Sequence, residues 1–197
     1  MRVLQILFVL GFGIWITGCA TIPTEERVDE DQAVDPDTLL AERADAVREA
    51  GGFVAVQEAS SLTMPTAQDR ALRRAREELA ESVVARVEAL QDAYLEGADP
   101  SDPEPVVHWF AEVQRYLQEL IAGGARPAVE KQVAEEGLST VWILVLENPG
   151  AIVQAMEIRA AADRQLFELV RSSRAYRELL AEAESFAAYR DVQDWID

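Results

Sequence analysis

The chain contains one cysteine and one histidine, Cys19 and His108, among its 197 residues. A thiol can act as a nucleophile, a metal ligand or an attachment point, and an imidazole can act as a general base or a metal ligand. Nucleophilic catalysis requires such a group, or a serine such as those at Ser60-Ser61, to lie beside an activating partner. The surroundings of each residue therefore decide which chemistry it supports.

Cys19 follows an N-terminal apolar stretch. Arg2 precedes an apolar run over residues 3–16 that is broken only by Gln5 and by glycines. This run has the length of a signal-peptide core and is short for a bilayer-spanning helix, which needs roughly 20 apolar residues. The run ends in Ile16-Thr17-Gly18-Cys19, an aliphatic residue, two small residues and the cysteine. This ending resembles the lipobox of bacterial lipoproteins.

The resemblance implies that signal cleavage occurs after Gly18 and that Cys19 becomes the lipidated N-terminus. Cys19 would then be an N-palmitoyl and S-diacylglycerol cysteine. A thiol that carries lipid needs no disulfide partner, which agrees with a single cysteine in the chain. The alternative is an uncleaved membrane anchor that ends by chance at a cysteine. Both alternatives hold the rest of the chain at a membrane.

The charge of the chain excludes some classes of partner. The sequence has 18 basic and 36 acidic residues, a net charge of −18, and signal cleavage would remove one arginine and no acidic residue to give −19. Binding to a nucleic-acid backbone needs clustered lysine and arginine, so we expect no nucleic-acid partner. Acidity of this size also disfavours binding flat on anionic lipid, so the lipid on Cys19 would supply the anchoring.

The remaining candidate residues lack partners in the sequence. His108 shares a predicted helix face with Glu112, Arg115 and Glu119, which is typical of a solvated surface rather than of a zinc ligand or catalytic base. Ser60-Ser61 lies at a predicted turn with no histidine nearby in sequence to activate a hydroxyl.

Three helical glutamates are further candidates for acid–base groups or metal ligands. Residues 77, 78 and 81 are glutamates, and residues 73, 74 and 76 are arginines, so we expect ion pairs within one exposed helix. The sequence accordingly predicts a protein that is not an enzyme, with no catalytic residue, no cofactor and no metal.

Composition divides the chain into four segments. Residues 1–18 form the predicted signal peptide. Residues 19–36 carry six acidic residues against Arg27 alone and predict an extended, flexible tether. Residues 37–154 form a predicted α+β domain, and residues 155–197 form a predicted C-terminal helical extension.

Hydrophobic periodicity predicts the elements of the domain. Apolar residues three and four apart predict helices, whereas alternation predicts strands. Thr140 to Glu147 is apolar on both faces and predicts the central strand, whereas Pro127 to Glu135 predicts an edge strand. The predicted helices cover 37–50, 66–96, 104–122 and a region from 149 that breaks near Ser172-Ser173 and resumes over 174–195; the predicted strands cover 53–59, 127–135 and 140–147.

Two regions of the sequence resemble a known family. The first is Gly52-Phe53-Val54-Ala55-Val56-Gln57-Glu58-Ala59 followed by Ala75-Arg76-Glu77-Glu78-Leu79-Ala80, and the second is Val129 to Val133, a turn, and Val141 to Val145. Together they resemble the Lpp-twenty family of twenty-kilodalton bacterial lipoproteins, which has flagellum-associated members. The resemblance covers about residues 51–154, and Gln57 stands where the family has glycine.

The resemblance implies a small α+β domain on an outer-membrane lipid anchor, with a structural or assembly role. We therefore predict an α+β fold, with a three-stranded antiparallel sheet, helices 66–96 and 104–122 on one face, and a long C-terminal helical segment. The predicted function is that of a non-enzymatic, lipid-anchored envelope protein, facing the periplasm, with other envelope proteins or itself as partner. The alternative is a periplasmic binding module for a small molecule or peptide, with its site at the sheet edge, and a third possibility is an envelope hydrolase.

Overall fold

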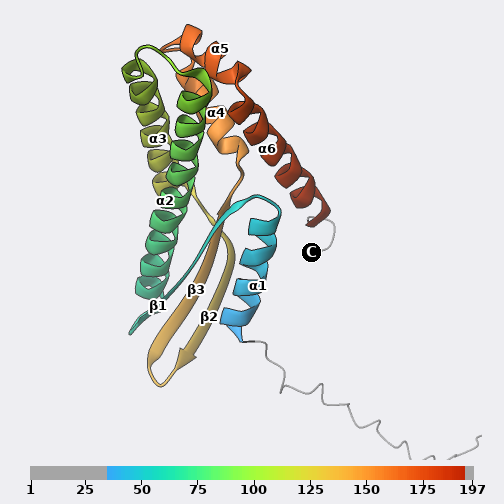
Figure 1. Cartoon of the computed structure of the whole chain (residues 1–197). Coiled ribbons are helices and arrows are strands. Elements are labelled where there is room, and N and C mark those ends of the chain that lie inside the picture. The colour runs from blue at the N-terminus through green and yellow to red at the C-terminus, as the bar shows by residue number, and fades with distance from the viewer. Residues whose placement is uncertain (1–34, 194–197) are drawn as a thin grey trace, which may run out of the picture. The chain divides into compact units, whose positions relative to one another are not determined.

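The computed structural model describes residues 35–193, which form an α+β fold with a three-stranded antiparallel sheet and six helices (Figure 1). This confirms the predicted fold class. The predicted signal peptide, Cys19 and nearly all of the predicted tether lie outside the described residues. In chain order the elements are α1 (Pro36–Glu49), β1 (Phe53–Ser61), α2 (Met64–Ala98), α3 (Glu104–Gly124), β2 (Pro127–Glu135), β3 (Leu138–Glu147), α4 (Gly150–Arg159), α5 (Arg164–Ser172) and α6 (Arg174–Gln193).

The strand order is β1-β3-β2, so the prediction of a central strand at 140–147 is confirmed. Leu144 at the middle of β3 lies opposite Val56 of β1 and Val129 of β2. A two-residue loop joins β2 to β3, and both of its residues have positive φ, 49° at Glu136 and 82° at Gly137. Positive φ at both loop residues matches the right-handed twist of the strands. The strand order places β2 at an edge of the sheet, as predicted.

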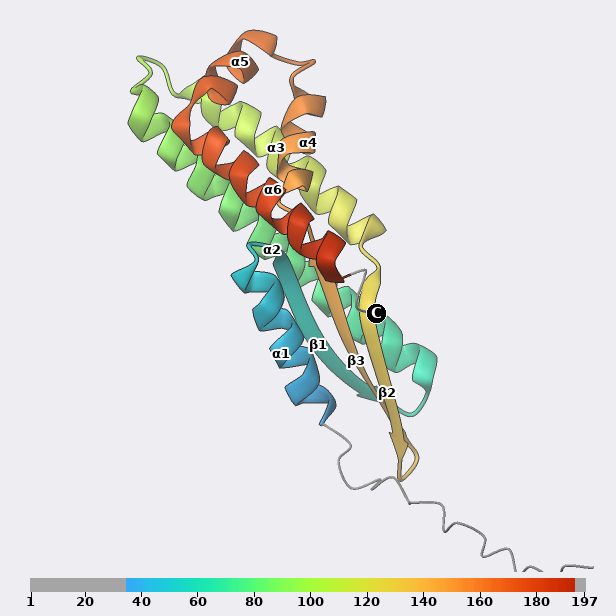
Figure 2. The ribbon, with the colours of Figure 1, turned by 90° about the vertical axis from the view of Figure 1, so that its right-hand side faces the viewer.

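The two faces of the sheet pack on different helices. Ile143 and the residues on its side of the strands join a large core with α2, whereas Leu144 and Val54 point the other way, toward α1. Figure 2 shows α1 and α2 on opposite sides of the strands. Successive strand side chains alternate between faces, which is why neighbouring residues of β3 serve two cores.

The arrangement of α3 differs from the prediction. The sequence predicted that helices 66–96 and 104–122 lie together on one face of the sheet. Of these two helices only α2 packs on the sheet, whereas α3 packs on α2 and α4. The helix α2 contacts β1, β3 and α3, and its Arg76 donates to the carbonyl of Ala125, the residue after α3. The helix α3 therefore lies alongside α2 rather than on the sheet.

The C-terminal region has one more break than predicted. The predicted interruption near Ser172-Ser173 is confirmed, because Ser173 separates α5 from α6, but a second one separates α4 from α5. At this second break the Asp163 carboxylate accepts a hydrogen bond from the Leu166 backbone N–H at 2.9 Å and so caps α5. Trp195, near the end of the predicted tail helix, lies outside the described residues.

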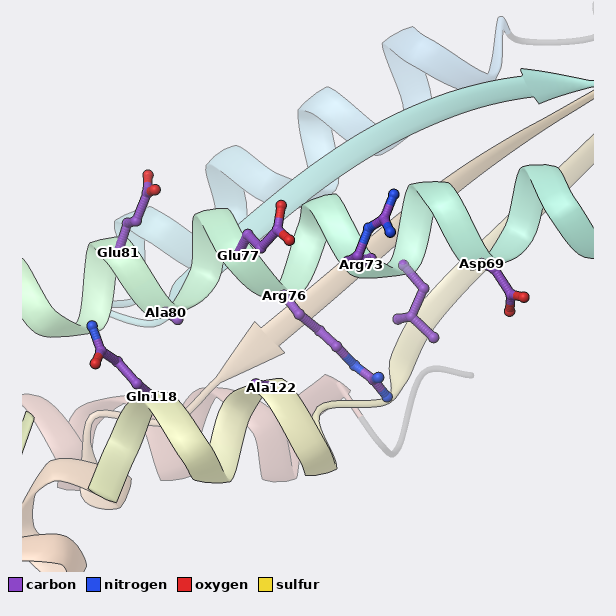
Figure 3. Close-up of a pocket in the computed structure, with 9 residues that line it drawn as sticks. Asp69, Arg73, Arg76, Glu77, Ala80, Glu81, Gln118 and Ala122 are labelled. Atoms are coloured by element: carbon purple, nitrogen blue, oxygen red, sulfur yellow. The ribbon is translucent and has the colours of Figure 1, made fainter. Parts of the chain in front are cut away.

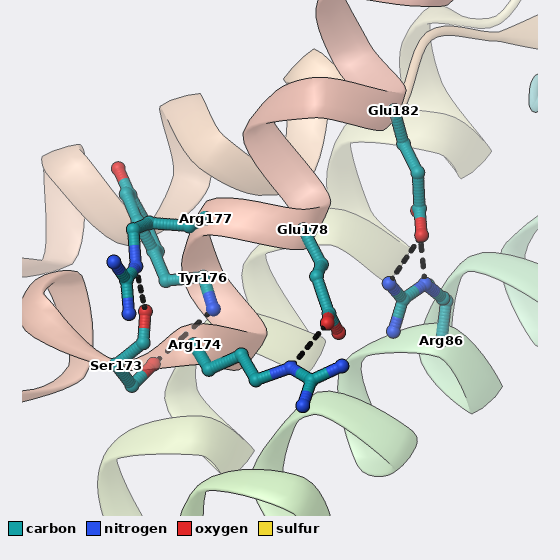
Figure 4. Close-up of polar contacts among 7 residues, drawn as sticks. All are labelled: Arg86, Ser173, Arg174, Tyr176, Arg177, Glu178 and Glu182. Atoms are coloured by element: carbon teal, nitrogen blue, oxygen red, sulfur yellow. Dashed lines mark hydrogen bonds and ion pairs between the residues drawn. The ribbon is translucent and has the colours of Figure 1, made fainter.

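Helix α6 packs on the same core as the preceding domain. Tyr176 and Leu179 belong to the large core, and Phe186 belongs to the smaller core with α1. Arg86 of α2 donates two hydrogen bonds to the Glu182 carboxylate, at 3.2 and 2.8 Å (Figure 4). The predicted extension therefore contributes to the domain core through its described residues, and the predicted boundary at 154/155 falls inside α4.

Candidate functional site

His108 lies on the exposed side of α3, as the helical spacing predicted. It faces a hollow of about 490 Å³ that forms where α3 meets α4 and the start of α5. Trp109 and Pro105 supply apolar walls. The polar residues that line the hollow are His108, Glu112, Arg159 and Asp163.

Both carboxylates in this hollow already have partners. Glu112 forms ion pairs with Arg115 and, at 3.8 Å, with Arg159. Asp163 caps α5, as described above. Within residues 35–193 the structure shows no hydrogen bond from His108 to either carboxylate, so the histidine lacks the oriented partner that a general base of a hydrolase requires.

Arg159 is the least satisfied polar side chain of the hollow. Its Nε atom is buried and has no hydrogen-bond partner among residues 35–193. Its Nη1 atom lies 3.8 Å from Glu112, beyond hydrogen-bonding distance, and its guanidinium carbon lies 5.4 Å from the centre of the Tyr116 ring. A guanidinium has five donors, and buried donors in native proteins usually find an acceptor. Because Nε is closed to solvent and the side chain is 31% exposed, an added acceptor can reach Arg159 only through its terminal amino groups.

A second hollow, of about 530 Å³, lies between α2 and the C-terminal part of α3 (Figure 3). The aliphatic residues Leu72, Ala80 and Ala122 form part of its lining. Figure 3 shows that Arg76 extends along this hollow, where its Nε donates to the Ala125 carbonyl at 2.8 Å. Its other charged or polar lining residues are Asp69, Arg73, Glu77, Glu81 and Gln118.

The ion pairs expected within α2 are absent from the described part of the chain, so that prediction is wrong. Arg76 reaches Ala125 instead, Arg74 donates to the Glu58 carbonyl at 3.4 Å, and Glu78 accepts a hydrogen bond from Gln57 at 2.6 Å. These side chains contact β1 and the residue after α3, because α2 packs against both the sheet and α3.

Ser60 does not lie beside an activating base. Its hydroxyl is 2.9 Å from the Thr140 hydroxyl on the adjacent strand, a cross-strand contact typical of a sheet surface. Because Ser60 belongs to β1, the turn predicted at Ser60-Ser61 begins instead after Ser61. Among the described residues no group of three or more histidine, cysteine or acidic residues is arranged to hold a metal ion.

The lipobox-like residues up to Cys19 lie outside the described residues. No helix within 35–193 combines the length and the apolar character needed to cross a membrane.

The hollow that holds Arg159 was missed by the sequence reasoning, which treated His108 as an isolated surface histidine. The sequence signal was present only in part: Glu112 precedes Arg115 on the same helix face, but Arg159 and Asp163 join them through the packing of α4 on α3.

Comparisons of the chain with protein families, with curated proteins and with solved structures found no match.

Proposed function

We propose that this chain is a non-enzymatic bacterial lipoprotein, anchored in the outer membrane through lipid on Cys19 and facing the periplasm. Its role is structural or assembly-related, in the cell envelope or in a flagellar outer-membrane structure. The observation that carries this proposal is the sequence Ile16-Thr17-Gly18-Cys19 at the end of an apolar run of signal-peptide length. The resemblance of residues 51–154 to the Lpp-twenty lipoproteins supports the flagellar or envelope role.

The number of residues between Cys19 and the folded domain supports a lipid anchor. The first described helix begins at Pro36, so sixteen residues separate it from Cys19. An extended chain spans at most about 3.3–3.6 Å per residue, so such a segment can place the domain some tens of ångströms from the bilayer. The mature chain, with a net charge of −19, is repelled by anionic lipid, which leaves the lipid on Cys19 as the anchor.

The edge strand β2 supports contact with another protein. Its only strand partner among the described residues is β3, and five of its nine residues are exposed. An open edge presents backbone donors and acceptors that a partner strand can use. Lys131 and Pro127 on this strand limit indiscriminate pairing between copies, because charge and proline both oppose edge-to-edge association.

The proposal is tested by Cys19→Ser in the source bacterium. We expect the substitution to abolish incorporation of an alkyne-labelled palmitate and to shift the protein from the membrane to the soluble periplasmic fraction. Unchanged labelling and fractionation would contradict the proposal. Ala20→Asp is the matched variant, which should keep the label but retain the protein in the inner membrane. In bacterial lipoproteins a residue other than aspartate after the lipidated cysteine, such as Ala20, generally goes with release to the outer membrane.

A periplasmic binding module for a small molecule or peptide is the second candidate. The hollows at α2–α3 and beside His108 favour it over a flat assembly surface, since ligand sites are concave and combine apolar walls with a few polar groups. In-cell crosslinking followed by mass spectrometry separates the two functions. Recovery of a specific envelope protein supports the assembly role, and recovery of no protein partner contradicts it.

A further inference from the structure

The hollow beside His108 brings together polar groups from three parts of the chain. His108 and Glu112 come from α3, Arg159 ends α4, and Asp163 precedes α5. Trp109 forms an adjacent wall, and its indole N–H donates to the Arg159 backbone carbonyl at 3.4 Å. That hydrogen bond joins α3 to the end of α4 and so holds the backbone of Arg159 in place beside the hollow.

The terminal amino groups of Arg159 make no hydrogen bond to the described residues, although Nη1 lies 3.8 Å from Glu112. The side chain is 31% exposed and its buried Nε is closed to solvent, so a ligand reaches Arg159 through these terminal groups. In contrast, Arg86 satisfies its guanidinium with two hydrogen bonds to Glu182. A carboxylate matches the planar fork of a guanidinium better than most other acceptors. The chemistry of Arg159 therefore favours a carboxylate ligand.

The neighbouring acidic groups restrict which carboxylate fits. Two carboxylates, Glu112 and Asp163, line the hollow with one arginine, Arg159, while Arg115 pairs with Glu112 from outside the lining. A ligand that carries only negative charge would be repelled by these groups. A ligand that also carries an ammonium group would gain from them, because Glu112 lies 3.8 Å from Arg159 and presents an acceptor next to the carboxylate position.

We propose that this hollow binds a small zwitterion of the α-amino acid class. The ligand carboxylate accepts hydrogen bonds from Arg159 and His108, and its ammonium group donates to Glu112 and Asp163. The apolar walls at Trp109 and Pro105 accommodate an apolar side chain. The site lies away from the sheet edge and requires no lipid on Cys19, so this inference goes beyond the proposed anchoring function and can fail separately from it.

Three related probes test the two ends of the ligand by isothermal titration calorimetry on the full-length protein in detergent. L-leucine carries both charges, N-acetyl-L-leucine keeps only the carboxylate, and L-leucinamide keeps only the ammonium group. Each lost charged hydrogen bond should weaken binding about tenfold or more. We therefore expect saturable binding of L-leucine and binding of the other two that is at least tenfold weaker.

Two substitutions test the protein side. Arg159→Met keeps much of the side-chain volume and removes the charge, and Glu112→Gln removes the charge that faces the ammonium group. Each should reduce L-leucine affinity about tenfold or more. Arg171→Gln is the matched control, because Arg171 is an exposed arginine of α5 that does not line the hollow and should leave the affinity unchanged.

Several results would overturn the inference. Absence of saturable L-leucine binding to the folded wild-type protein contradicts it, and so does equal binding of N-acetyl-L-leucine, which would indicate a simple anion site. Retained affinity in Arg159→Met also contradicts it. If Arg159→Met unfolds, the exposed His108→Ala serves in its place and should lower the affinity for L-leucine and N-acetyl-L-leucine more than for L-leucinamide.

Discussion

The ring of Phe186 lies directly against Gly52, so that a Cβ atom at position 52 would come within 2.2 Å of Cε2 of the ring. Phe186 is fully buried and belongs to the core that α1 forms with one face of the sheet. Gly52 lies between α1 and β1, and Phe186 lies in the second half of α6. This one contact therefore joins the C-terminal helix to the N-terminal part of the domain.

Gly52→Ala should destabilise the protein, because the added methyl group forces the Phe186 ring to move in a packed core. Overpacking of this kind costs about 1–3 kcal/mol. Chemical denaturation of the full-length protein in detergent measures the loss. Gly123→Ala is the matched control: nothing lies within 4 Å of a Cβ there, and alanine in a helix should leave stability unchanged or raise it. Equal effects of the two substitutions would show that Gly52 is not under steric constraint.

Phe186→Ala should cost more, about 3–5 kcal/mol, because it removes a fully buried aromatic side chain and leaves a cavity. The same substitution should remove most of the penalty of Gly52→Ala, since the added methyl group then enters the cavity. Denaturation of the two single variants and the double variant measures this coupling. Strictly additive losses would contradict direct packing of Phe186 on Gly52.

The ion pair between Arg86 and Glu182 should stabilise the attachment of α6 only slightly. Its side chains are 27% and 41% exposed, and partly exposed pairs contribute up to about 1 kcal/mol. A double-mutant cycle with Arg86→Met and Glu182→Gln measures the coupling. The matched pair is Arg174 and Glu178, which lie four residues apart on α6 (Figure 4) and are 87% and 56% exposed. That pair should show no measurable coupling, and a larger value there than for Arg86–Glu182 would contradict the account.

Glu147 should make stability depend on pH. Burial raises the pKa of its carboxyl above the ordinary value of 4.5, against the lowering effects of the Asn148 N–H and of Arg190. A pKa that is higher in the folded chain means that ionisation, as pH rises through the folded pKa, removes stability. Glu147→Gln should therefore raise the free energy of unfolding at pH 7, and this advantage should disappear below about pH 4.

Denaturation curves of wild type and Glu147→Gln at pH 7 and at pH 4 measure the difference. Glu184→Gln on the exposed side of α6 is the control, and it should leave stability nearly unchanged at both pH values. A Glu147→Gln variant that is less stable than wild type at pH 7 would show that the ionised carboxylate is stabilising, contrary to the prediction.

The sheet could be predicted from the sequence because its signals are local. The run from Val141 to Val145 is apolar on both faces, and Glu136-Gly137 supplies the residues that a tight turn needs. The helix α2 could also be predicted from its apolar residues at three- and four-residue spacing, although it begins at Met64 rather than at residue 66.

Contacts between distant residues could not be predicted in this way. No periodicity relates Phe186 to Gly52, or Arg159 to His108, because these pairs meet only after α6 and α4 have packed. The prediction for α3 was wrong for the same reason: its apolar stripe shows that it packs on another element, but the sheet and α2 are equally apolar partners. The arginines of α2 also follow tertiary contacts, as the Arg76 bond to Ala125 shows.

Mass spectrometry of the mature N-terminus tests the lipid anchor most directly. The full chain is produced in a bacterium that processes lipoproteins, and its N-terminal proteolytic peptide is sequenced. The account predicts a peptide that begins at Cys19 and carries both the diacylglycerol and the N-linked palmitoyl group. A peptide that begins at Met1, or one that contains an unmodified Cys19, would contradict the account.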